Sequence, residues 1–87
     1  IANSTLNVSG TLSASMGITA SNHIVPDQDA VYNLGEDAKR WANIYTADLH
    51  MKNDRGDWTV IEEEDYLSIR NNKNGKLYKF VLEEIED

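Results

Sequence analysis

Strict alternation of apolar and polar residues between Leu6 and Ala20 constrains the fold of this chain more than any other feature. Even positions in this stretch are apolar or glycine, whereas odd positions carry Asn, Ser, Thr or Gly. A period of two places alternate side chains on opposite faces of a β-strand, so the pattern predicts strand and not helix. Because a typical strand has only about five or six residues, Gly10 and Gly17 are predicted to mark bends between shorter strands.

The apolar stripe of this segment needs a covering surface, and the chain has no second amphipathic element of comparable length. Another copy of the same segment is the simplest cover. A three-fold arrangement would turn the even-numbered side chains toward a shared axis and pair strand edges between chains. The alternative is a flexible linker rich in Ser and Thr. The residues predicted to form the core of the trimer here are Leu6, Val8, Leu12, Met16 and Ile18.

A corner between two strands is predicted over residues 31–46, after a turn that contains Pro26. Gly35 can adopt the positive φ that ends the first strand. Residues 36–41 contain no helix breaker, and acidic residues precede basic ones, as the helix dipole favours. This segment is therefore predicted to form one short helical turn. The residues of the corner predicted to be structural core are Leu34, Trp41, Ile44 and Tyr45.

The C-terminal half predicts a meander of antiparallel strands. Strands are expected at residues 47–52, 58–61, 66–70 and 76–82, with turns at 53–57, 62–65 and 71–75 between them. Gly56 is available for a left-handed turn position, and Asn74-Gly75 is a strong hairpin signal. The last expected strand is apolar on both faces, which suggests contact with a neighbouring subunit. Trp58 and Phe80 are expected to be core residues.

The predicted fold is therefore all-β: an intertwined trimeric fibre segment followed by a small antiparallel β-meander domain with one short helical turn. Residues 1–25 are assigned to a β-structured shaft segment and residues 26–87 to a C-terminal tip or cap domain. At 87 residues, a chain of this size buries only about 60 to 65% of its unfolded surface when it folds alone. With no cysteine available for a disulfide, oligomerisation is the remaining way to stabilise so small a core.

The net charge and the lack of a long apolar stretch limit the classes of partner. The chain has 15 Asp and Glu residues against 8 Lys and Arg, a formal charge of −7, which argues against nucleic acid as a ligand. No stretch approaches the roughly 20 apolar residues that a membrane-spanning helix needs, so no membrane insertion is expected. The chain starts at Ile1 and lacks a signal-peptide pattern, and we expect it to be a piece of a longer protein.

The sequence offers little for catalysis. It has no cysteine, no nucleophile-elbow or phosphate-loop motif and no His-Glu-x-x-His, so we predict that it is not an enzyme and uses no cofactor. The two imidazoles, His23 and His50, form no His-x-His pair, and no metal site is predicted. Exposed aromatic and amide side chains are typical contacts for sugars. The candidate receptor or glycan contacts are Tyr66, Asn71 and Asn72.

A family resemblance covers roughly the last two thirds of the chain. Its residues are Tyr32-Asn33-Leu34-Gly35, the run from Arg40 through Trp41 and Tyr45 to His50, residues 53–59, and residues 74–80. Together they resemble a pattern near the C-terminal ends of tail fibre and tailspike proteins of tailed bacteriophages. In some members of that family the segment precedes a self-cleaving chaperone domain, but the cleavage dyad expected for such a domain does not occur in this sequence.

The resemblance implies a homotrimeric component of the virion tail fibre, extracellular when assembled. It implies a structural and adhesive role, as a trimerising cap and as a tip that contacts a host cell-surface glycan or protein. The alternative from a different functional class is a monomeric carbohydrate-binding module attached to a larger enzyme. A stable trimer favours the first hypothesis, whereas glycan binding by an isolated monomer favours the second.

Overall fold

A computed structural model describes residues 6–86 of the chain. The chain divides into two units, Ile1–Glu36 and Asp37–Asp87. All regular secondary structure in the described residues is β-strand, and it lies in the second unit. This confirms the all-β prediction and the antiparallel meander. The predicted division between residues 25 and 26 stays a prediction.

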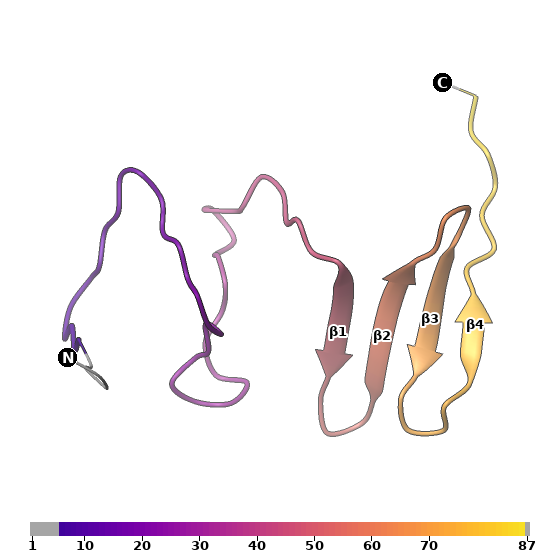
Figure 1. The fold of residues 1–87 in the computed structure, drawn as a ribbon, viewed down its shortest axis with the longest axis horizontal. Helices are drawn as coiled ribbons and strands as arrows, with labels where there is room; N and C mark the ends of the chain where they lie inside the picture. Colours follow the sequence, from indigo (N-terminus) through magenta and orange to yellow (C-terminus); the bar gives the residue numbers. More distant parts are fainter. Residues whose placement is uncertain (1–5, 87) are drawn as a thin grey trace. The chain divides into compact units, whose positions relative to one another are not determined.

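The second unit contains one four-stranded antiparallel sheet, whose strands lie side by side in chain order (Figure 1). The strands are β1 (Asp48–Lys52), β2 (Asp57–Glu62), β3 (Leu67–Asn71) and β4 (Leu77–Lys79). Each consecutive pair is joined by a short hairpin connection, so the sheet needs no crossover. As a result, β2 and β3 are central strands, while β1 and β4 form the two edges.

The turn between β1 and β2 is closed by Asn53. Its backbone N–H donates to the carbonyl oxygen of Gly56 at 2.9 Å, and its side-chain oxygen accepts from the N–H groups of Arg55 and Gly56 at 2.8 and 2.9 Å. The predicted left-handed conformation of Gly56 is wrong, because its φ is not positive. Glycine serves another purpose here: a Cβ atom would lie 3.1 Å from Nε1 of Trp58, so its absence lets the indole approach the turn.

The turn between β3 and β4 follows the Asn74-Gly75 signal. The N–H of Gly75 donates to the carbonyl oxygen of Asn71 at 2.8 Å, and the N–H of Asn71 donates to that of Lys76 at 2.9 Å. Gly75 has φ of 76°, a left-handed conformation that residues with a Cβ adopt only at a cost. The side chain of Arg70 also donates to the Gly75 carbonyl at 2.9 Å, which further fixes the turn.

The register gives the sheet one apolar and one mainly polar face, because alternate residues of a strand point to opposite sides. The apolar face carries Leu49, Met51, Trp58, Val60, Leu67, Ile69 and Tyr78, with Glu62 and Asn71 at the ends of their strands. The opposite face carries Asp48, His50, Lys52, Asp57, Thr59, Ser68, Arg70 and Lys79, together with Ile61 and Leu77. The names apolar face and polar face are used below for these two sets.

No apolar side chain of residues 6–86 is buried. The only buried side chains in that part of the chain are the hydroxyl residues Thr59, 6% exposed, and Ser68, 1% exposed. A sheet with one apolar face is normally covered by a second layer of structure, and the unit Asp37–Asp87 contains only this one layer in its described residues. The apolar face is therefore left half-exposed.

Two further expectations from the sequence differ from the structure. The helical turn over residues 36–41 is absent, and residues 37–38 form a tight turn instead. A single helical turn forms only one or two hydrogen bonds, but it fixes the backbone of several residues. Without a packing partner, these bonds do not offset the lost conformational entropy. The last strand ends at Lys79 and not at residue 82. The N–H of Phe80 donates to the carbonyl oxygen of Leu67, which is the first residue of β3. Residues after Phe80 therefore have no partner in β3.

The unit Ile1–Glu36 has no β-strand in its described residues. The chain bends at residues 9–10 and 15–16, beside the two glycines of the alternating stretch, and Gly17 has φ of 118°. A turn at residues 29–31 includes Ala30 with φ of 57°. A strand that pairs only with other copies finds no partner in a single chain, so the shared-axis shaft stays a prediction.

The turn at Gly75 generates the first prediction. Gly75→Ala should lower the free energy of unfolding by about 1 kcal/mol, because a Cβ is unfavourable at positive φ, and should lower the melting temperature by several degrees. Gly10→Ala is the matched control, since nothing lies within 4 Å of a Cβ at Gly10 and its φ is not positive. Thermal unfolding followed by circular dichroism measures both. Equal melting temperatures for the two variants would show that a Cβ at position 75 causes no strain in the turn.

Candidate functional site

The centre of the apolar face is a shallow hollow lined by Met51, Trp58, Ile69 and Tyr78. The rings of Trp58 and Tyr78 lie with centroids 6.1 Å apart and planes tilted by 44°, within the range of favourable aromatic pairs. Tyr78 is 47% exposed and Leu49, on the first strand, is 48% exposed. An exposed apolar patch of this kind is a candidate interaction surface.

The polar face contains a hydrogen-bond network centred on Thr59. The amide nitrogen of Asn72 donates to Oγ1 of Thr59 and to Oδ1 of Asp57, both at 2.9 Å. The Thr59 hydroxyl lies 3.1 Å from Nδ1 of His50. Since the hydroxyl accepts from Asn72, its own hydrogen is available to His50. The network thus joins β1, β2 and the turn after β3, and it satisfies a buried hydroxyl.

Two further contacts tie the loop after β2 to the sheet. Ser68 donates from its buried hydroxyl to a carboxylate oxygen of Glu63 at 2.8 Å. The ammonium group of Lys79 lies 4.8 Å from the centroid of the Tyr66 ring, a favourable cation–π distance. The Glu63 carboxylate is therefore a structural acceptor, and one face of the Tyr66 ring is already occupied.

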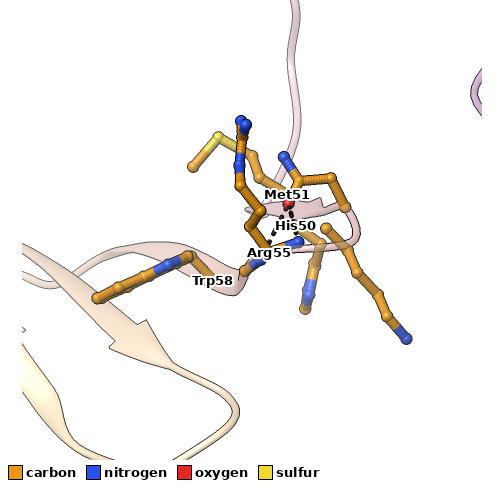
Figure 2. A pocket seen from close by; sticks show the side chains of 7 residues that line it. His50, Met51, Arg55 and Trp58 are labelled. Carbon is orange, nitrogen blue, oxygen red and sulfur yellow. Dashed lines mark hydrogen bonds between the residues drawn. The ribbon is translucent and has the colours of Figure 1, made fainter.

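A second, open hollow surrounds the turn after β1 and is lined by His50, Lys52, Asn53, Arg55 and Trp58, among others. Figure 2 shows that the side chains of Arg55 and Trp58 point in different directions from this turn. The dashed lines there are the bonds from the Arg55 and Gly56 backbone to Asn53. The side chains of Arg55 and Trp58 therefore do not converge on one point of this hollow.

The predicted receptor contacts do not form one site. Tyr66 lies in the loop before β3, whereas Asn71 ends β3 and Asn72 follows it, so they lie at opposite ends of that strand. The side-chain oxygen of Asn71 accepts from the N–H groups of the following turn, at 3.0 Å from Lys73. Asn72 is engaged with Thr59 and Asp57. The two asparagines thus have structural partners within the chain, while Tyr66 remains 40% exposed.

The predicted core residues differ in how far they are exposed. Trp58 is half-buried on β2, and Phe80 follows β4 with 37% exposure. The others are exposed in the single chain: Leu6, Val8, Leu12, Met16, Ile18, Leu34, Trp41, Ile44 and Tyr45. Their assignment to a trimer core stays a prediction, because a single chain does not contain the surfaces that a trimer would bury.

The Thr59 network is not predicted by the alternation of residues in the sequence. Alternation alone assigns Thr59 and His50 to polar faces of their strands, but only the register places them opposite each other. No group of three or more His, Cys, Asp or Glu residues suited to a metal ion occurs in residues 6–86. Within the same residues, no helix is long and apolar enough to cross a membrane.

Comparisons with protein-family models, curated proteins and solved structures gave no match.

The Thr59 network generates the second prediction. Thr59→Val keeps the shape of the side chain but removes the hydroxyl, which leaves one Asn72 hydrogen and His50 Nδ1 without this partner. We expect a loss of about 1 to 2 kcal/mol in the free energy of unfolding. Thr59→Ser retains the hydroxyl and should be less harmful. Urea unfolding of both variants measures the difference, and a Val variant as stable as the parent would show that the network does not contribute.

Proposed function

We propose that this chain is a structural and adhesive component of a bacteriophage tail fibre, a homotrimeric cap that also presents a surface to the host cell. The family resemblance in residues 32–35 and 40–50 suggests the class of protein. One observation in the structure supports the assembly role: the sheet has an apolar face that its own unit leaves uncovered.

Because the described residues have no buried apolar core, we propose that the fold needs assembly for its stability. A sheet with one apolar face normally buries it against a second layer, and none of the apolar side chains of residues 6–86 is buried. The intertwined shaft proposed for residues 1–25 has the same need, because Leu12 and Met16 are 67% and 96% exposed. Association of three copies would cover both regions at once.

The adhesive role is carried by the groups that assembly would leave outside. The polar face and the loop at Tyr66 carry ring, amide and charged groups of the kinds that bind sugars and protein surfaces. These groups form no cluster suited to catalysis, and we propose a binding role without enzymatic activity, cofactor or metal. The site of action would be the assembled virion outside the cell.

The third prediction concerns the assembly state. Light scattering over a range of concentrations at moderate salt should give the mass of three chains, about three times 9.8 kDa, and the trimer should persist on dilution. Adhesion is tested in parallel with immobilised bacterial surface polysaccharides. A compact monomer that binds glycans would contradict the trimeric cap and favour a carbohydrate-binding module.

A further inference from the structure

The two edges of the sheet match each other. β1 pairs antiparallel with β2, β2 with β3, and β3 with β4, so β1 and β4 run in opposite directions. Rotation about an axis parallel to the strands leaves strand direction unchanged. A neighbouring copy placed by such a rotation therefore brings its β1 antiparallel to β4 of the first copy, the pairing already used throughout the sheet.

The same rotation keeps the faces of the sheets consistent. If one copy turns its apolar face toward the axis, every copy does, and the polar faces with the Thr59 network all lie outside. Closure of this kind also removes both exposed edges, which otherwise invite aggregation. Burial of the apolar face and pairing of the edges are thus achieved by one arrangement.

The width of the sheet determines how many copies fit. Strands lie about 4.8 Å apart, so four strands span about 19 Å, and packed sheets lie about 10 Å from one another. Three such sheets arranged as the sides of a triangular prism lie about 5.5 Å from its axis, close to half of the ~10 Å packing distance. Four sheets would lie about 10 Å from the axis and leave an unfilled channel.

The charges on the edges match as well. Asp48, Ile61, Ser68 and Lys79 form one row across the sheet, from edge to edge. Rotation about an axis parallel to the strands keeps every row at its height, so it places Lys79 of one copy beside Asp48 of the next. An opposite-charge pair facing across strands is favourable. A shift of the register by two residues would place Lys79 beside His50 instead, without this pairing.

We propose that three copies join β4 of one sheet to β1 of the next and close a triangular prism with the apolar faces inside and Lys79 opposite Asp48 at each junction. The partner is a second and third copy of this chain, because one chain carries both matching edges and both charges. The inference rests on the homotrimer proposed above and names the surfaces through which it forms.

The junction is tested by cross-linking in the full chain, which contains no native cysteine. Within one copy, positions 48 and 79 are three strand spacings apart, about 14 Å, too far for a disulfide. Across the junction they face each other at about 5 Å between Cα atoms. The double variant Asp48→Cys/Lys79→Cys should therefore form covalent dimers and trimers on mild oxidation, resolved on a denaturing gel without reductant.

Three controls define the result. Each single variant should stay uncross-linked, because the junction joins two different positions. His50→Cys/Lys79→Cys should cross-link much less, since those positions are diagonal neighbours about 7 to 8 Å apart. A trimeric mass without cross-links in the Asp48→Cys/Lys79→Cys variant would overturn the junction and leave the proposed trimer intact. A monomeric mass of the parent chain would contradict the trimer itself.

A matched pair of substitutions on β4 tests the direction of the faces. Leu77 and Tyr78 are adjacent, lie on opposite faces and are each 47% exposed. Tyr78→Lys places a charge inside the prism and should raise the concentration at which the trimer dissociates by at least tenfold. Leu77→Lys should leave that concentration unchanged. Light scattering measures the mass and circular dichroism checks that the sheet is retained. Dissociation by Leu77→Lys alone would show that the polar face is the one buried.

Discussion

Hydrogen bonding within the sheet is the interaction on which the rest of this structure depends. The only buried side chains in residues 6–86 are Thr59 and Ser68, and both make hydrogen bonds through their hydroxyls. They lie on β2 and β3, the two central strands. The ladder and these hydroxyl bonds define the shape of the sheet, whereas its apolar face is only half covered and would add its full stability when another layer covers it. A fold organised in this way specifies strand order and register before it has a core.

This order of construction separates the tasks of the two faces. The apolar face is free of charged groups in its middle, from Leu49 across Val60 and Ile69 to Tyr78. The polar face holds its imidazole and amide groups in a network that already satisfies them. In the proposed fibre, the outer face would have to remain soluble while the inner face associates. Alternation along each strand meets both requirements, because neighbouring residues serve opposite faces.

Much of the meander follows from the sequence, while the contacts around it do not. The alternation of Leu49 and Met51 predicted β1, and Asn74-Gly75 predicted the turn before β4, because both signals are local. The role of Asn72 depends on residues 13 and 15 positions earlier, which only the register brings near. Local signals also gave two wrong predictions. Residues 36–41 suit a helix but have nothing to pack against. Val81 suits a strand, but β3 has no residue left to pair with it after Leu67 pairs with Phe80.

Partial exposure of the apolar face would link folding to the proposed assembly. Side chains of the face such as Leu49, Met51 and Tyr78 are 45 to 48% exposed, so their neighbours in the sheet cover about half of each. Full burial of a large apolar side chain contributes about 1.5 to 3 kcal/mol, and the uncovered half leaves about 1 kcal/mol per residue to be gained on association. Several such residues per copy amount to a substantial part of the 5 to 15 kcal/mol typical of domain stability. In the proposed trimer, the stability of the chain would therefore depend on its concentration.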